Sequence, residues 1–136
     1  MSRRQKRAAN IARATRGVTF DTGMLVALER RHAGALAVLR ACRLSRASIT
    51  IPAAVVAEWW RGAHRALLES GRVEALTPAL AEHAGELLAS TVGSNAVDAT
   101  VIASAALRGD LVVTGDETDL RELARFVRGV TVERLR

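Results

Sequence analysis

The order of strand-like and helix-like segments along the chain is the feature that most constrains the fold. Short runs rich in β-branched residues occur at 18–20, 48–51, 111–113 and 130–132. Longer stretches of helix-forming residues separate these runs. Strands that alternate with helices are typical of a parallel sheet. The sequence therefore predicts an α/β fold in the order strand, helices, strand, helices, strand, helix, strand.

Start and stop signals locate the helices between these strands. Pro52 suits the first turn of a helix, because proline lacks an N–H group that this turn leaves unpaired, and we expect one long helix at 52–68. Thr77 and Pro78 give the same signal before a helix that reaches residue 88, and Asn95 begins a helix that Gly109 ends. Further helices are expected after residue 21, at 33–42 and from residue 116.

The net charge of +6 is concentrated at the N-terminus. Residues 1–17 contain six basic side chains and no acid, whereas the remaining 119 residues are formally neutral. We therefore divide the chain into a basic N-terminal arm, or the product of a start codon assigned too far upstream, at 1–17 and a folded domain at 18–136. The arm is expected to be a frayed helix or mobile, and the overall charge is weak evidence for RNA binding.

Several classes of protein are excluded by simple observations. No apolar run approaches the roughly 20 residues of a membrane helix, so no membrane association is expected. The basic first residues are not followed by the apolar segment of a secretory signal. Cys42 has no second cysteine to form a disulfide. These observations predict a cytoplasmic protein.

Three aspartates lie where parallel strands or their helices meet one edge of the sheet. Asp21 follows the first strand, Asp116 comes three residues after the third strand, and Asp98 lies in the first turn of its helix. Sites in open parallel sheets form at this edge. Each residue also has a structural explanation, because Asp21 and Asp116 could cap helices and Asp98 could pair with Asn95 in a cap. For each residue taken alone, capping is the commoner role.

Glu58 differs from the three aspartates because no helix cap explains it. It lies within the helix expected from Pro52, flanked by Val55, Val56, Trp59 and Trp60. These neighbours predict partial burial, which is costly for an unpaired carboxylate. Arg61 follows about one turn later and is expected at the rim of the site. Trp59 and Trp60 are assigned to the core or an interface, with stacking on RNA bases as the alternative.

Four carboxylates in one cavity would oppose each other's ionisation. A divalent cation with a preference for oxygen ligands, Mg²⁺ or Mn²⁺ as a substitute, relieves this repulsion. Such a site orients water and stabilises charge on a phosphate. The constellation of Asp21, Glu58, Asp98 and Asp116 therefore favours phosphodiester hydrolysis.

Four segments resemble the successive motifs of PIN-domain nucleases, in the right order and spacing. They are FDTGMLVAL, IPAAVVAEWWRG, NAVDATVIASAA and LVVTGDETDL. The resemblance covers residues 18–136 and is greatest to the VapC toxins of bacterial toxin–antitoxin pairs. It implies a three-layer α/β/α fold with a short central parallel sheet, and a metal-dependent endoribonuclease.

The resemblance also implies roles for single residues. Asp21, Asp98 and Asp116 would bind magnesium, and Glu58 would position or activate the attacking water. Thr114 matches the hydroxyl residue that precedes the fourth acid and would support the carboxylates, whereas Gly115 stands where a serine is more usual. The family implies RNA as substrate, a homodimer, and an antitoxin protein that covers the active site.

Two other functions stay open on the sequence alone. One is an inactive PIN module that binds RNA or protein without cutting, which the four intact acids disfavour. The other is a metal-dependent phosphatase or DNA nuclease on a similar sheet. The chain lacks the additional arches or domains of DNA flap nucleases, and this disfavours the DNA form.

Overall fold

A parallel sheet forms the centre of the molecule. The computed structural model describes residues 2–13, 17–115 and 118–136. Its strands are β1 (Gly17–Phe20), β2 (Ser48–Pro52), β3 (Arg72–Glu74), β4 (Leu111–Thr114) and β5 (Thr131–Arg134). They form one five-stranded sheet in the order β3-β2-β1-β4-β5, and all its pairings are parallel. The predicted α/β class is confirmed, and β1 occupies the central position.

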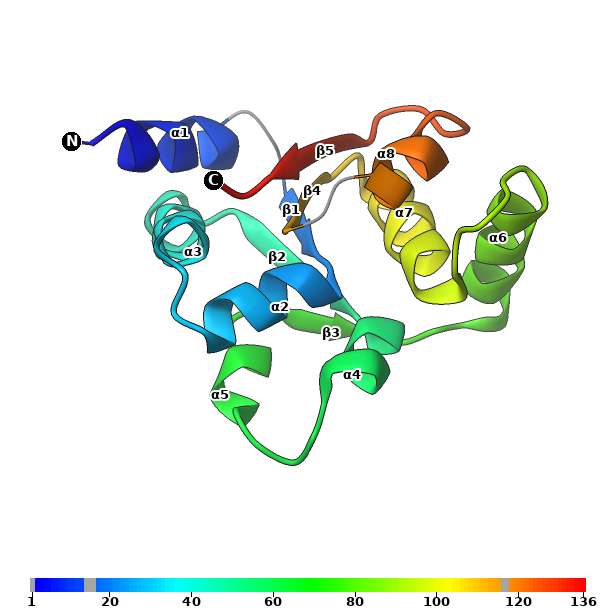
Figure 1. Ribbon diagram of the computed structural model, residues 1–136, viewed down its shortest axis with the longest axis horizontal. Coiled ribbons are helices and arrows are strands. Elements are labelled where there is room, and N and C mark those ends of the chain that lie inside the picture. Colours follow the sequence, from blue (N-terminus) through cyan, green and yellow to red (C-terminus); the bar gives the residue numbers. More distant parts are fainter. Residues whose placement is uncertain (1, 14–16, 116–117) are drawn as a thin grey trace.

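Helices cover both faces of the sheet and complete three layers. The helices are α1 (Arg3–Arg13), α2 (Thr22–Glu29), α3 (Ala33–Ser45), α4 (Ala53–Trp59), α5 (Arg65–Leu68), α6 (Pro78–Ala89), α7 (Ala96–Arg108) and α8 (Thr118–Ala124). Figure 1 shows α1, α2 and α3 on one side of the strands and α6, α7 and α8 on the other. None of the described helices is both long and apolar enough to cross a membrane.

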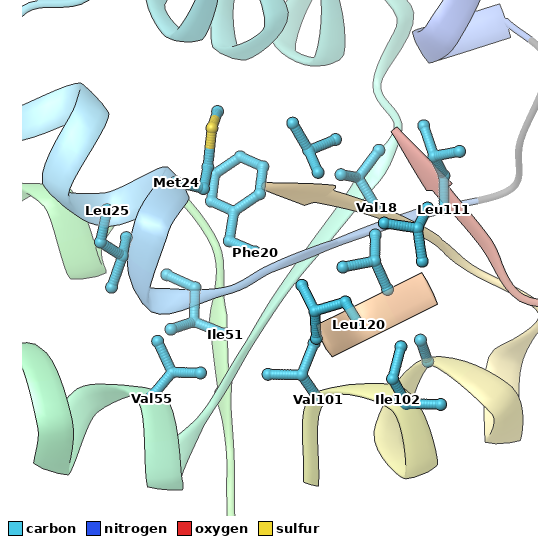
Figure 2. Packing of buried hydrophobic residues seen from close by; sticks show 14 of the residues in the cluster. Val18, Phe20, Met24, Leu25, Ile51, Val55, Val101, Ile102, Leu111 and Leu120 are labelled. Atoms are coloured by element: carbon cyan, nitrogen blue, oxygen red, sulfur yellow. The ribbon is translucent and has the colours of Figure 1, made fainter. Parts of the chain in front are cut away.

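The core explains why the two central strands are almost continuously apolar. All four residues of β1 and of β4 are buried, as expected for strands with helices on both faces. Figure 2 shows core side chains from β1, α2, β2, α4, α7 and α8 that converge on the sheet. Among them Phe20, Leu25 and Val101 are fully buried. Burial of each such side chain contributes roughly 1.5–3 kcal/mol to folding.

Two elements differ from the sequence expectation. The expected helix at 52–68 is wrong, because α4 ends at Trp59 and α5 is a separate short helix. Trp60 is extended, and Gly62 adopts a φ of +87°, which glycine tolerates and which no α-helix contains. Strand β3 was not expected at all. It is three residues long, lies at the edge of the sheet and leaves Val73 exposed, so it lacks an apolar pattern.

The N-terminal segment also differs from the frayed or mobile arm that we expected. Residues Arg3–Arg13 form α1, which packs along α3. Ala8 is buried, and the Arg7 guanidinium donates to a Glu133 carboxylate oxygen at 2.8 Å. The segment therefore forms part of the packed structure, whereas the proposed division of the chain at residue 17 stays a prediction.

A polar network connects α7 to the sheet. Arg108, near the end of α7, donates to Glu74 at the end of β3, to Asp110 at 2.9 Å and to Thr19 of β1 at 3.0 Å. Ser104 and Thr19 complete the network by donating to Glu74 and Asp110. Asp110 and Thr19 are buried. The carboxylates of Asp110 and Glu74 are each neutralised by Arg108 and hydrogen-bonded within the network.

Candidate active site

Asp21 lies at the end of the central strand and begins α2. It has an extended backbone, and its Oδ1 accepts the Met24 N–H at 2.8 Å, so it is the N-cap of α2. The structural explanation considered for this residue is therefore correct. However, capping alone does not require burial, and Asp21 is only 6% exposed. The fold places a capping carboxylate inside the protein.

Thr114 holds the other oxygen of this carboxylate. It is the last residue of β4, it is fully buried, and its hydroxyl donates to Asp21 Oδ2 at 2.5 Å. Because β1 and β4 are paired in parallel, both residues reach the same edge of the sheet. The hydroxyl residue that the motif placed before the fourth acid thus contacts the first acid.

Asp98 is the second described carboxylate at this edge. It lies in the first turn of α7, where Asn95 is the N-cap. The two residues bond reciprocally: the Asp98 N–H donates to Asn95 Oδ1 at 2.9 Å, and Asn95 Nδ2 donates to Asp98 Oδ2 at 3.1 Å. The expected capping pair is confirmed. Asp98 also interacts electrostatically with Asp21.

The environment of Asp21 makes its ionisation costly. Burial raises its pKa from 3.8 to about 6, and the neighbouring charge of Asp98 raises the pKa as well. The bonds from Thr114 and Met24 act in the opposite direction because they stabilise the charged form. The net result is a carboxylate whose charge is incompletely compensated by protein groups. A bound cation would supply the missing compensation.

The structure describes only one of the remaining two predicted acids, Glu58. The expected partial burial of Glu58 is wrong, because its side chain is exposed on α4. Helix α4 packs against α2 and α7, the two helices at whose N-terminal ends Asp21 and Asp98 lie. Asp116 lies outside the described residues. Within residues 2–13, 17–115 and 118–136, no three His, Cys, Asp or Glu side chains are grouped closely enough to hold a metal ion.

Arg61 lies beyond the end of α4, and its expected place at the rim of the site stays a prediction. Since α4 ends at Trp59, Arg61 does not continue the helix face of Glu58. Its guanidinium donates to the Trp60 carbonyl at 2.7 Å. Arg65 lies over the Trp60 ring, 5.2 Å from its centroid. Trp59 is buried, which confirms the core assignment for this residue.

Gly23 permits a close approach that the sequence did not reveal. A Cβ atom at this position would lie 3.1 Å from the Gly115 backbone nitrogen and 3.4 Å from Asp21 Oδ1. The start of α2 therefore lies directly against the segment that follows β4. A Cβ atom at Gly115, where the motif more often has serine, would lie 3.7 Å from the Gly23 carbonyl oxygen, which is an ordinary contact, so this approach requires glycine at 23 and not at 115. The glycine after Asp21-Thr22 was visible in the sequence, but the sequence did not show that the segment after β4 approaches it.

The donor set fits a magnesium ion. Mg²⁺ binds proteins through one or two carboxylates and keeps several of its water ligands, which matches the Asp21 and Asp98 pair. The buried hydroxyl of Thr22, next to Asp21, has no hydrogen-bond partner among the described residues. Buried hydroxyls normally have such a partner, and a metal-bound water is one that would suit it. The oxygen-only chemistry of these groups disfavours zinc.

Comparisons with known proteins identify the fold and the family. The chain is similar to a chain in the crystal structure of VapBC2 from Rickettsia felis bound to a DNA fragment from their promoter, with 14% identity and a TM-score of 0.68. The match covers 88% of this chain and 98% of that chain, and at this identity it shows a shared fold. The comparison with curated proteins finds no match. The family model of the PIN domain matches residues 18–126, which is most of the chain, and the protein therefore belongs to the PIN-domain family.

Proposed function

We propose that this PIN-domain protein is a magnesium-dependent endoribonuclease that hydrolyses RNA phosphodiester bonds. The observation that carries the proposal is the buried Asp21 carboxylate, held by Thr114 and opposed by the charge of Asp98. A carboxylate in this condition gains more from a bound cation than an exposed one would. PIN-family membership and the oxygen donors at the sheet edge support the same conclusion.

Each residue has a distinct part in the proposed reaction. Asp21 and Asp98 hold the metal, and Thr114 fixes the orientation of Asp21 through its hydroxyl. A magnesium ion held there would supply a water of lowered pKa and would stabilise charge on the phosphate. We retain Asp116 as a third ligand, and Glu58 as the group that positions or activates the attacking water. The exposure of Glu58 is compatible with the latter role, since solvent and substrate can both reach it.

We further propose that the protein is the toxin of a toxin–antitoxin pair. The four motifs resemble those of VapC toxins, and the fold is shared with a chain of the Rickettsia felis VapBC2 structure. An antitoxin protein would then cover the acidic edge of the sheet, and the protein would form a homodimer. Arginine side chains of such a partner could form paired hydrogen bonds with the carboxylates that otherwise bind metal.

One experiment tests the nuclease proposal against its alternatives. Labelled single-stranded RNA, single-stranded DNA and an aryl phosphate are incubated with the protein, in magnesium and in chelator. We expect cleavage of RNA alone, only with magnesium. Asp98→Asn should reduce the rate by at least about 100-fold, because a metal ligand contributes several kcal/mol to transition-state stabilisation. Glu86→Gln, which removes an exposed acid on α6, is the matched control.

The other outcomes identify the competing functions. Hydrolysis of the aryl phosphate or of DNA in place of RNA would indicate a phosphatase or a DNA nuclease. Binding of RNA without cleavage in any metal would indicate an inactive binding module. Wild-type cleavage by Asp98→Asn would show that Asp98 is not a ligand.

A further inference from the structure

A cluster of arginines surrounds a small cavity where α1, α3 and β5 meet. The lining includes Arg4 and Arg7 from α1, Arg134 at the end of β5, and Arg136. Its apolar part comes from Ala8, Val38, Val113 and Leu135. Figure 1 shows the C-terminal end of the chain beside α1. The cavity has a volume of about 20 Å³, enough for one water molecule, so a larger anion would bind at its mouth.

The positive charge of this arginine cluster is only partly neutralised. Arg7 pairs with Glu133 at 2.8 Å and also donates to the Arg134 carbonyl at 3.2 Å. Arg4, Arg134 and Arg136 are exposed and form no ion pair within the part of the chain that the structure describes. Like charges held close together attract anions and are stabilised by them. The cluster thus has the chemistry of an anion-binding surface.

The sheet places this arginine cluster next to the proposed active site. Arg134 is the register partner of Thr114 in the pairing of β4 with β5, and the Leu135 N–H donates to the Thr114 carbonyl at 2.8 Å. Neighbouring strands lie about 4.8 Å apart. Thr114 in turn bonds Asp21. Asp21 at the end of β1 and Arg134 at the end of β5 therefore share one end of the sheet, two strand spacings apart with β4 between them.

We propose that Arg4 and Arg134 hold backbone phosphates of the RNA beside the phosphate that is cleaved. This inference rests on the proposed nuclease function and assigns the surface that guides the substrate toward it. Arginine suits the task because its planar guanidinium can bond two phosphate oxygens at once. Both arginines lie outside residues 18–126, the part of the chain that the family model matches.

The test is the salt dependence of RNA binding, measured in chelator so that no cleavage occurs. Fluorescence anisotropy of a labelled single-stranded RNA gives the binding constant for the wild type, Arg4→Gln/Arg134→Gln, and the control Arg40→Gln/Arg128→Gln. The control removes two exposed charges elsewhere on the surface. Two lost phosphate contacts should reduce the slope of log K against log salt by about 1.4. The control should keep the wild-type slope, as should Arg4→Lys/Arg134→Lys, which retains both charges.

The outcomes separate this inference from the nuclease proposal. Equal slopes for the glutamine variant and the control would overturn the phosphate contacts, even if the wild type cleaves RNA. A reduced slope in a protein that never cleaves would support the contacts and count against the nuclease. If the glutamine variant loses affinity for a polyglutamate peptide and keeps the RNA slope, the cluster binds an acidic protein segment instead, and the inference is wrong. Thermal unfolding of each variant verifies that folding is intact.

Discussion

At the scale of single residues, Asp21 serves two roles that have different requirements. As the N-cap of α2 it needs only an oxygen near the Met24 N–H, and an exposed residue would suffice. Its burial adds an electrostatic cost that helps no local structure. The sequence predicted the position of Asp21 correctly because caps and strand ends are local features. The contact with Thr114 could be expected only through a family resemblance, since the two residues meet through strand pairing.

The first prediction concerns the pH dependence of stability without metal. Asp21 has a higher pKa in the folded state, about 6, than its ordinary value of 3.8, so the folded protein binds the proton more tightly. The resulting stabilisation is fully present below pH 3.8 and is lost as pH rises through 6. A difference of about two units corresponds to about 3 kcal/mol at most. Urea unfolding of the wild type and Asp21→Asn between pH 4 and 7 measures this loss.

Asp21→Asn serves as the control for this prediction. Asparagine keeps the cap but cannot ionise, so the free energy of unfolding of Asp21→Asn should lack this component. Saturating magnesium should remove the difference between the two proteins above pH 6, since the ion compensates the charge. Parallel pH profiles of the two proteins without metal would contradict the raised pKa.

The second prediction concerns the Thr114 hydroxyl. Thr114→Val removes a donor that stabilises ionised Asp21, so the pKa of Asp21 should rise further. Magnesium affinity near neutral pH should fall by about 10–100-fold, as for other groups that orient a metal ligand. Thr114→Ser keeps the donor and is the matched control. Isothermal titration with magnesium measures the effect, and equal affinities for the valine and serine variants would contradict it.

At the scale of elements, the predictable helices were those with clear end signals. Helix α6 begins after the Thr77 cap with Pro78, and α7 lies between Asn95 and Gly109 as expected. The end of α4 also had a signal, Gly62, but the expected helix continued through it. Strand β3 gave no signal, because its stability depends on pairing with β2 and on Glu74, which Arg108 bonds. Contacts between distant segments carry no local pattern.

The third prediction concerns the network around Arg108. Arg108 is 23% exposed, and Asp110 and Glu74 are 4% and 16% exposed. Arg108→Ala leaves the buried Asp110 without its cation and Glu74 with only Arg72, at 3.6 Å, and should reduce the free energy of unfolding by about 3–5 kcal/mol. Arg125→Ala breaks the exposed pair with Glu122 and should cost less than about 1 kcal/mol. Urea unfolding compares the two, and similar costs would mean that the network is not stabilising.

At the scale of the whole molecule, the main difference from the sequence expectation is the N-terminal helix. Its charge suggested an arm, since six basic residues without an acid are typical of exposed segments. The structure instead packs one side of α1 on α3 through Ala8, while Arg3 and Lys6 stay exposed. The packing could not be foreseen because the covering surface of α3 lies outside the segment itself. The helix brings Arg4 and Arg7 to the end of β5.

The fourth prediction follows from this packing. Removal of residues 2–13 should reduce the free energy of unfolding by about 1–3 kcal/mol, because apolar surface on α3 becomes exposed. Ala8→Glu should destabilise through the same contact, whereas Lys6→Glu places the same new acid on the exposed side and should have little effect. Thermal unfolding tests the set. An unchanged melting temperature after the deletion and in Ala8→Glu would show that α1 behaves as the arm first expected.

The pairing of β1 with β4 also determines when the carboxylate becomes buried during protein synthesis. Thr114 follows Asp21 by 93 positions, which takes a ribosome roughly 5–20 s at ordinary elongation rates. Until β4 has emerged, the nascent chain has the acid without the strand that encloses it. A chain released early by a premature stop codon would carry Asp21 in water, with no raised pKa. For an enzyme proposed to cut RNA, this order of assembly keeps unfinished chains inactive beside the messenger that encodes them.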